Sequence, residues 1–333
     1  MYLQLSKRSK GEMEIILVGV LLSLVIIVCT ALYWFVFRAT DKRLRVTALH
    51  IFPVKSIRGF TAKEWPLDDF GLAKDRNWMI VRTNNHKFLT QREMPKMALI
   101  SASLSPDLNT LTLSAPECDD LIIIEGSEVI QVEIWKKQYD AIDMGTTAAE
   151  WLSTFLNTEV RLVKIPPLHK RDATPKYLTD FLKCEPKPCL GTGFADGFPL
   201  LLGAEESLHD LNKRIRKSNQ KPIEMIRFRP NIVVNGQRPY EEDEWNTIKI
   251  GELTCYNVKP CTRCTIPNVN PKEGKKDTSV REILDSYRHS DELDNPLFAI
   301  NLVHAVNTVG KRIHVGDLIT VEKWQNAPIT IKN

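Results

Sequence analysis

Residues 247–264 read TIKIGELTCYNVKPCTRC, and this stretch joins a strand signal to the most reactive side chains of the chain. Thr247–Val258 is rich in β-branched and aromatic residues and predicts a β-strand. The strand leads into a C-x-x-C pair, Cys261 and Cys264, with Arg263 between the two cysteines. Because a thiolate acts as a metal ligand, a nucleophile or a redox group, we expect the chemistry of this chain at the end of this strand.

The strand-type pattern recurs along most of the chain from Val46 onward. Short β runs bounded by turn residues are predicted at Val46–Phe52, Trp78–Arg82, Ala98–Leu104, Thr110–Ser114, Leu121–Glu125, Glu128–Ile134, Arg161–Ile165, Leu200–Leu202, Ile232–Asn235, Leu297–Val303 and Leu318–Lys323. Helices are predicted at Thr146–Leu156, where Thr146 or Thr147 is the expected N-cap, at Glu205–Lys217 and at Ser279–Arg288. No regular βαβ alternation occurs, so the pattern predicts a mixed α/β, β-rich fold of β-barrel type rather than a doubly wound sheet.

The chain has 333 residues, enough for two domains of ordinary size. Pro166-Pro167 and the largely polar stretch to Pro188 interrupt the β pattern and divide it into two halves. The predicted organisation is an N-terminal tail (1–14), a transmembrane anchor (15–37), a linker (38–45), an N-terminal β-rich domain (46–165) and a second domain (170–325).

The predicted anchor, Ile15–Phe37, contains 23 residues without a charge. A helix of that length spans ~35 Å, enough to cross the ~30 Å hydrocarbon layer. A cleaved signal peptide usually has an apolar core of only about 7–15 residues, so a retained anchor is favoured. Four basic residues follow the run and three precede it, which favours a C-terminal part in the cytosol.

Charge and cysteine content exclude a nucleic-acid-binding domain and a small disulfide-rich secreted domain. Residues 1–45 hold seven basic and three acidic residues, and subtracting these from the totals of 45 and 41 leaves 38 of each sign. The rest of the chain is therefore neutral, unlike a typical nucleic-acid-binding domain. Seven irregularly spaced cysteines in a long chain do not form the framework of a small secreted domain, and they favour a reducing compartment.

Three chemical interpretations of the cysteine pair stay open on spacing alone. A redox dithiol normally lies at a helix start in a βαβ context, which is missing here. Structural zinc would need Cys184 and Cys189 to join Cys261 and Cys264 in a four-thiolate site. The third interpretation is a single thiolate bound to a soft metal centre, with the other cysteine as its neighbour.

Basic residues in other segments favour the third interpretation. Arg227 and Arg229 lie in a compact RFRPN segment, and Lys55 and Arg76 lie in polar breaks between β runs. Arginine offers a planar fork suited to an anionic phosphate. Gly191-Thr192-Gly193, by contrast, lacks the preceding strand and the spacing of a dinucleotide fingerprint, so a turn-rich loop is expected there.

At these residues the chain resembles the MOSC-domain proteins, and among them the mitochondrial amidoxime-reducing components. The matching segments, in chain order, are Pro53-Val54-Lys55-Ser56, Gly71-Leu72 with Asp75-Arg76 and Trp78, Phe194-Ala195-Asp196-Gly197-Phe198-Pro199, Phe228-Arg229-Pro230-Asn231, Lys259-Pro260-Cys261-Thr262-Arg263-Cys264 and Val315-Gly316-Asp317. One such segment is weak, whereas the ordered set over about Val46 to Lys323 is specific.

The resemblance implies a MOSC-type β-barrel after a MOSC-associated N-terminal β-rich region, and a molybdenum–molybdopterin cofactor whose metal is bound by the catalytic residue Cys264. The residues that it implies around the cofactor are Lys55, Ser56, Arg76, Asp196, Arg229, Asn231, Thr262 and Arg263. It further implies reduction of N-hydroxylated compounds such as amidoximes and hydroxylamines, with electrons from NADH through a reductase and cytochrome b5. Anchored members lie in the mitochondrial outer membrane with the catalytic part facing the cytosol, and pyridoxal phosphate binding is associated with the family as a whole.

Two features qualify the resemblance. Animal relatives place a Thr-Ser pair where this chain has Gly197-Phe198, which puts that corner of the cofactor site in question. The MOSC fold also occurs at the end of molybdenum-cofactor sulfurases, so the alternative function is a non-catalytic carrier of the cofactor or of its sulfur. Turnover with an electron-donor chain distinguishes the enzyme from the carrier.

Overall fold

The computed structural model describes residues 20–28, 43–167, 171–173, 177–236, 238–325 and 331. The chain divides into two compact units, Met1–Arg43 and Leu44–Asn333. In the first unit, residues 20–28 are helical. Within the described ranges, no helix has both the length and the apolar character needed to cross a membrane. The predicted tail 1–14 lies outside the described residues, as do most of the predicted anchor 15–37 and of the predicted linker 38–45.

The second unit is built around one large, mainly antiparallel sheet, with strands in the order β2-β1-β13-β12-β19-β15-β14-β21. The strand bounds are β1 Val46–Ile51, β2 Phe60–Ala62, β12 Leu200–Ala204, β13 Ile232–Val234, β14 Trp245–Ile250, β15 Leu253–Thr262, β19 Asn295–His304 and β21 Ile319–Trp324, with β18 His289–Ser290 paired to β19. The β12–β13 pair is parallel, whereas β1, β15 and β19 run antiparallel to their neighbours.

The sheet curls so that its two ends approach each other without forming a closed barrel. Arg45 and Leu318 form a single antiparallel bridge, and the amide of Val46 donates to the carbonyl of Asp317 (3.0 Å). The rest of that edge of β1 is taken by β2, from Leu49 to Ile51. Because β1 shares this edge between two neighbours, no continuous β1–β21 ladder forms, and the predicted barrel is barrel-like rather than closed within the described residues.

Apolar side chains fill both faces of this sheet. One face holds a core that includes Trp245, Ile248, Leu302 and Leu49, all with 0% exposure. The other face is covered by α3 (Glu205–Lys217) and α4 (Val280–Arg288), whose buried residues pack with Phe228 and Phe298. Both helices are amphipathic, so burying one stripe of each supplies much of the packing energy of this half.

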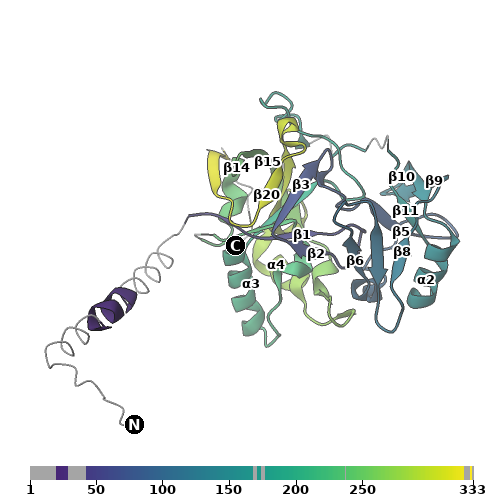
Figure 1. The fold of residues 1–333 in the computed structure, drawn as a ribbon, viewed down its shortest axis with the longest axis horizontal. Coiled ribbons are helices and arrows are strands. Elements are labelled where there is room, and N and C mark those ends of the chain that lie inside the picture. The colour runs from purple at the N-terminus through teal and green to yellow at the C-terminus, as the bar shows by residue number, and fades with distance from the viewer. Residues whose placement is uncertain are drawn as a thin grey trace, which may run out of the picture. The chain divides into compact units, whose positions relative to one another are not determined.

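A second group of elements forms the N-terminal β-rich region, which Figure 1 shows beside the large sheet in blue and teal. One sheet runs β5-β11-β10-β9 and another β6-β7-β8, and both pack with the single helix α2. The bounds are β5 Trp78–Arg82, β6 Ser101–Leu104, β7 Leu111–Ser114, β8 Leu121–Ile123, β9 Glu128–Ile134, β10 Lys137–Asp143, α2 Thr146–Leu156 and β11 Val160–Lys164. The described residues of both regions belong to the one unit from Leu44. The predicted boundaries at 46–165 and 170–325 stay a prediction.

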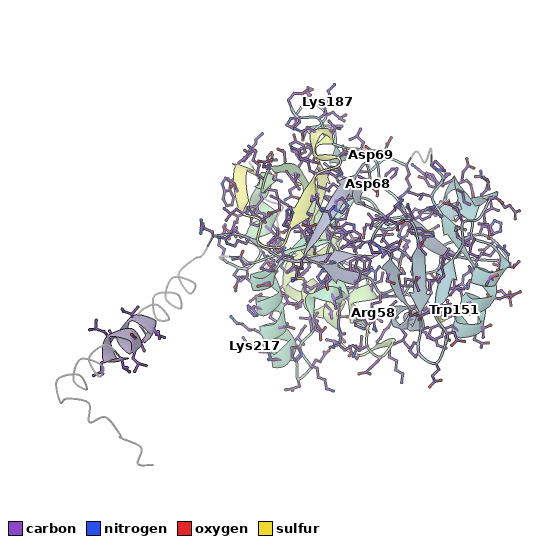
Figure 2. The ribbon with its side chains drawn as sticks, in the orientation of Figure 1. Arg58, Asp68, Asp69, Trp151, Lys187 and Lys217 are labelled. Atoms are coloured by element: carbon purple, nitrogen blue, oxygen red, sulfur yellow. The ribbon has the colours of Figure 1, made fainter. Side chains whose placement is uncertain are left out.

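Short elements join the two regions. A small sheet, β20-β3-β4, combines Glu64–Asp68 (β3), Gly71–Leu72 (β4) and Arg312–His314 (β20), and β16 (Val269–Asn270) pairs with β17 (Lys275–Lys276). Arg58, labelled between the regions in Figure 2, donates its side-chain Nη2 to the carbonyl of Pro271. Its own backbone pairs with Ile100 and Ala102, so one residue contacts both regions. The 3₁₀ helices are η1 Pro95–Leu99, η3 Met225–Phe228, η4 Glu241–Glu244, η5 Ile266–Asn268 and η6 Val306–Thr308.

Most predicted elements are confirmed, and the errors have local causes. Thr146–Leu156 and Glu205–Lys217 are helices with the predicted bounds. The predicted N-cap is wrong, because Gly145 occupies that position and no side chain caps the helix. The predicted strand Thr247–Val258 is two antiparallel strands, β14 and β15, joined at Gly251, whose φ of +56° reverses the chain.

The buried carboxyl of Glu242 provides a test of this packing. Glu242 has 0% exposure and accepts hydrogen bonds from the Ser207 hydroxyl at 2.7 and 2.9 Å. Burial raises the pKa of Glu242, and the neighbouring Asp243 adds to the rise. A carboxyl whose pKa is higher in the folded than in the unfolded chain stabilises the fold at low pH, and that contribution is lost as the pH rises toward the raised pKa.

We therefore expect the free energy of unfolding of the wild type to fall, relative to that of Glu242→Gln, as the pH rises from about 4.5 to 7. A pKa difference of one between the two states is worth about 1.4 kcal/mol. Urea unfolding at pH 5, 6 and 7 measures this difference. Glu252→Gln, at an exposed position in the β14–β15 turn, should show no such trend, and a constant offset for Glu242→Gln would contradict the prediction.

Candidate functional site

One pocket of about 400 Å³ lies where the large sheet meets the N-terminal β-rich region. Every residue predicted to hold a cofactor or metal lines it: Lys55, Ser56, Arg76, Asp196, Arg229, Asn231, Thr262, Arg263 and Cys264. Arg227, which neighbours Arg229 in sequence, does not line the pocket and forms an ion pair with Asp277 instead. The structure therefore brings together side chains that are up to about 200 residues apart in the sequence.

The wall carrying Lys55, Ser56 and Arg76 is held by pairing between two loops. The amide of Lys55 donates to the carbonyl of Trp78 (2.8 Å), and the amide of Arg76 donates to the carbonyl of Phe52 (2.8 Å). Ser56 and Arg76 have φ angles of 62° and 51°, which non-glycine residues rarely adopt. Such strained backbone persists where the surrounding structure fixes it, as it often does at functional sites.

Lys55 and Asp196 form an ion pair at this wall. The Lys55 ammonium also donates to the carbonyl of Phe194 at 2.9 Å. Burial lowers the pKa of Lys55, and the attraction of Asp196 partly offsets this effect. Desolvation raises the pKa of Asp196, but the charge and hydrogen bond of Lys55, with Arg92 and Arg171 further along, bring it down to about 2. The Asp196 carboxyl is therefore ionised at neutral pH.

Arg76 and Arg229 lie against the same aromatic ring. Their guanidinium carbons are 4.5 and 4.2 Å from the centre of the Phe52 ring. Arg76 pairs with Asp75 and donates to the carbonyl of Arg229 (3.0 Å), whereas Arg229 donates Nη1 to the carbonyl of Ile57 (2.6 Å). Burial and then the repulsion of Arg76 lower the pKa of Arg229 to about 9. Its Nη2 is buried without a hydrogen-bond partner.

Arg263 distinguishes the two cysteines of the pair. Its Nη1 donates to the sulfur of Cys261 (3.0 Å), and its Nη2 donates to the carbonyl of Phe228 (2.9 Å). The Nε of Arg263 is buried without a partner. Cys264 follows the end of β15 and lines the pocket with a partly exposed, free thiol. Cys261 is thus held by a neighbouring cation, while the Cys264 sulfur faces the pocket without that contact.

The four-thiolate zinc interpretation is wrong. Throughout the described ranges, no group of three or more His, Cys, Asp or Glu side chains is placed to hold a metal ion. Cys189 is buried at the base of β19, where its amide donates to the carbonyl of His304 (2.7 Å). Burial raises the pKa of Cys189 to about 11. A single-thiolate metal site remains compatible with this geometry.

Asn231 lines the pocket, and both polar atoms of its side chain already form hydrogen bonds. Its amide oxygen accepts from the amide of Leu201 (3.2 Å), and its amide nitrogen donates to the carbonyl of His50 (3.3 Å). Asn231 therefore fixes the start of β12 against β1, and its predicted contact with a cofactor stays a prediction. Thr262 is the last residue of β15 and pairs with Leu297, which places it directly before the Arg263–Cys264 segment.

The prediction missed Arg171, which organises the loop that carries Asp196. Its guanidinium donates to the carbonyls of Gly193 (2.6 Å), Ala195 (2.6 Å) and Asp196 (2.9 Å). Arg171 lies in the polar stretch interpreted as a connection, so no local pattern indicates its role. A Cβ on Gly193 would lie 2.9 Å from the carbonyl oxygen of Arg76. This close approach explains why glycine occupies position 193, in a loop whose glycines only superficially resemble a dinucleotide-binding motif.

The rim of the pocket contains further residues that the prediction missed. Arg92, Trp135, Tyr177 and Lys259 all line it. Phe198 of the Gly197-Phe198 pair lies 6.3 Å from the Tyr177 ring, centre to centre. The phenyl ring thus makes an apolar contact at this corner of the pocket.

The sequence matches the family model of the MOSC N-terminal beta barrel domain over residues 43–159 and that of the MOSC domain over residues 191–320. Mitochondrial amidoxime-reducing component 1 of Mus musculus is 32% identical over 263 residues, which cover 76% of this chain and 74% of that protein. The chain belongs to the MOSC-domain family. The resemblance inferred from its ordered motifs is confirmed.

Other relatives of this MOSC protein fall into two groups by length. Mitochondrial amidoxime reducing component 2 of Homo sapiens is 31% identical over 290 residues, which cover 82% of each chain. Molybdenum cofactor sulfurase of Oryza sativa subsp. japonica is 30% identical over 261 residues, which cover 74% of this chain but only 31% of that protein. The chain thus spans most of the first kind of relative and about a third of the second.

The hydrogen bonds of Arg171 give a prediction about the Asp196 loop. Lysine keeps the charge but lacks the planar fork that reaches three carbonyls, so Arg171→Lys should destabilise the MOSC protein by about 2–3 kcal/mol. Hydrogen exchange should accelerate at Phe194, whose amide donates to the carbonyl of Arg76 (2.7 Å). Arg216→Lys, at an exposed position on α3, is the matched control. Unchanged exchange at residues 193–198 would show that the loop does not depend on Arg171.

Proposed function

We propose that this MOSC protein is a molybdenum-cofactor oxidoreductase that reduces N-hydroxylated compounds such as amidoximes and hydroxylamines. The observation that carries the proposal is the pocket itself, where Cys264 lies among buried cations with two unpartnered donors, Arg229 Nη2 and Arg263 Nε. Its relatives named amidoxime-reducing components support the reaction class.

The residues present fit an anionic, phosphate-bearing group with a soft metal. The pocket is lined by six cations against the single carboxylate of Asp196. Burying a guanidinium nitrogen without an acceptor costs free energy, so the two orphaned donors favour an incoming anion. A thiolate is a ligand that suits a soft metal. Pyridoxal phosphate binding, associated with the family as a whole, stays a prediction.

In this proposal Cys264 binds the metal, and Lys55, Ser56, Arg76, Arg229, Thr262 and Arg263 hold the pterin and its phosphate. When bound, the cofactor supplies two-electron redox chemistry at the metal. The net reaction consumes two electrons and two protons and converts an amidoxime to an amidine and water.

In this proposal the protein's own side chains bind the cofactor and orient it. An ammonium has three N–H donors, and Lys55 uses two of them on Phe194 and Asp196, which leaves one for an anionic group. Arg263 donates to the sulfur of Cys261, so that sulfur, which also lines the pocket, already has a partner when Cys264 takes the metal. Arg76 and Arg229 stabilise negative charge through guanidinium groups already fixed by carbonyl acceptors and the Phe52 ring.

We also propose the electron donors and the location that the resemblance implies. Electrons from NADH pass through a reductase and cytochrome b5 to the pocket. The segment 15–37 anchors the chain in the mitochondrial outer membrane, or in another membrane that faces the cytosol, with the pocket on the cytosolic side. The support is the uncharged run in the sequence and the printed names of the mitochondrial relatives.

A carrier of molybdenum cofactor or of its sulfur is the second candidate, favoured by the match to molybdenum cofactor sulfurases. A carrier needs the same pocket but no turnover. Reduction of benzamidoxime by the purified, cofactor-loaded chain with NADH, reductase and cytochrome b5 would therefore favour the enzyme. Binding and transfer of the cofactor without any turnover would favour the carrier.

The cysteine pair gives the decisive mutational test. Cys264→Ala should abolish molybdenum binding and lower benzamidoxime reduction roughly 100-fold or more, because the metal loses its protein ligand. Cys261→Ala, the matched control from the same pair, should retain about one molybdenum per chain. Metal analysis and turnover are measured on the same preparations. Full activity of Cys264→Ala would overturn the proposed function.

The proposed anchor has a separate test. Replacing Leu24 and Val25 with arginine places two charges near the middle of the apolar run, each costing about 2.5–3.5 kcal/mol in a membrane-inserted helix. We expect the double arginine variant to move from the alkali-resistant membrane fraction to the supernatant, while the double alanine variant stays with the membrane. Retention of the arginine variant in the membrane fraction would count against the anchor.

A further inference from the structure

Two cation–aromatic pairs form the outer part of the pocket. The guanidinium carbon of Arg92 lies 5.1 Å from the centre of the Trp135 ring. The Lys259 ammonium lies 4.5 Å from the centre of the Tyr177 ring. All four residues line the same pocket as Cys264 and come from separate segments. None of them belongs to the residues assigned above to the cofactor. We call Arg92, Trp135, Tyr177 and Lys259 the rim.

The two rim cations differ from the cations deeper in the pocket. Lys55 is paired with Asp196, and Arg76 with Asp75. Arg229 and Arg263 are bound to backbone carbonyls. By contrast, in the part of the chain that the structure describes, neither Arg92 nor Lys259 has a carboxylate within ion-pair distance, and both are partly exposed. The rim therefore presents positive charge to whatever enters the pocket.

Trp135 is held at the rim in a strained turn. Trp135 and Lys136 connect β9 to β10 with φ angles of 51° and 67°, a two-residue hairpin turn that favours asparagine and glycine. The Trp135 side chain is 48% exposed, and its ring meets the edge of Phe88 at 5.1 Å between centres. A bulky aromatic residue kept in a left-handed turn and supported from one side indicates a surface for stacking.

We infer that the rim selects substrates by charge and shape: Arg92 and Lys259 favour flat N-hydroxylated compounds that carry a carboxylate over cationic ones, and Trp135 stacks on their rings. This inference rests on the proposed function and names the substrate class of the same site. Arg92 and Lys259 are specificity-determining residues in this scheme. They attract a carboxylate at the entrance and repel a positive charge placed there.

The same charge acts on the product. An amidoxime is neutral at neutral pH, whereas the amidine formed by taking up two electrons and two protons, with loss of water, binds a further proton and becomes cationic. The rim repels this cation, so product leaves the pocket more readily than substrate. Charge selection at entry and release of product are thus two consequences of one arrangement.

The test uses three amidoximes of similar size: benzamidoxime, its 4-carboxylate and its 4-trimethylammonium derivative. For the cofactor-loaded wild type, we expect kcat/KM and affinity by calorimetry to fall in the order carboxylate, neutral, cation. Lys259→Met and Arg92→Met should each reduce the carboxylate-to-cation ratio roughly 25-fold, because one unit charge at about 4 Å in water changes the binding of each of the two charged compounds about fivefold, in opposite directions. The preference should weaken in high salt. Trp135→Ala should raise KM for all three compounds, and Trp135→Phe should bring KM most of the way back to the wild-type value.

The control is Lys217→Met at the end of α3 (Figure 2), which removes one exposed charge that does not line the pocket. This variant should keep the wild-type ratio. An equal ratio in the wild type and the two rim variants would overturn the inference, as would loss of molybdenum from Lys259→Met, because Lys259 would then hold the cofactor. Tighter binding of the carboxylate compound without any turnover supports the rim and overturns only the proposed reductase function.

Discussion

The burial of like charges around one pocket is the constraint on which the rest of the site depends. Arg76 and Arg229 lie against one phenyl ring, and burial lowers the pKa of Arg229 to about 9. Such an arrangement is costly unless each guanidinium finds acceptors or an anion. The fold supplies acceptors as backbone carbonyls and the Asp75 carboxylate. Two donors, Arg229 Nη2 and Arg263 Nε, are left without a hydrogen-bond acceptor. These unsatisfied donors point to a bound anion.

The scaffold explains how those charges stay in place. Lys55 and Ser56 follow β1, Arg229 and Asn231 precede β13, and Cys264 follows β15, so three strands of one sheet each end at the pocket. The N-terminal β-rich region contributes Trp135 from the hairpin between β9 and β10. Strands fixed by a packed core position the deep residues, and turns position the rim. In the proposed function, this division places the groups that hold the cofactor at the ends of packed strands and the groups that meet the substrate on turns.

Arg171 and the loop residues up to Phe198 lie between these two parts. Arg171 binds three carbonyls of the loop, and Lys55 binds Phe194 and Asp196. Two buried cations therefore hold the part of the loop that carries Asp196, beside isolated backbone bridges such as Asp172–Gly191. The apolar ring of Phe198 lies near that of Tyr177. The rim, at Tyr177, and the loop that carries Asp196 thus meet at this corner of the pocket.

The sequence by itself determined the β-rich class, two of the long helices and nine of the residues that line the pocket, because helical periodicity is a local pattern and the motifs follow one another in order along the chain. Only the tertiary structure decided that β1 shares its edge between β2 and Asp317–Leu318, so that the barrel does not close. It also showed that Arg263 contacts the sulfur of Cys261, and it brought Arg171, Arg92 and Lys259 to the site. These features depend on contacts between residues far apart in the sequence, and no local pattern encodes which buried cation meets which carbonyl, thiol or ring.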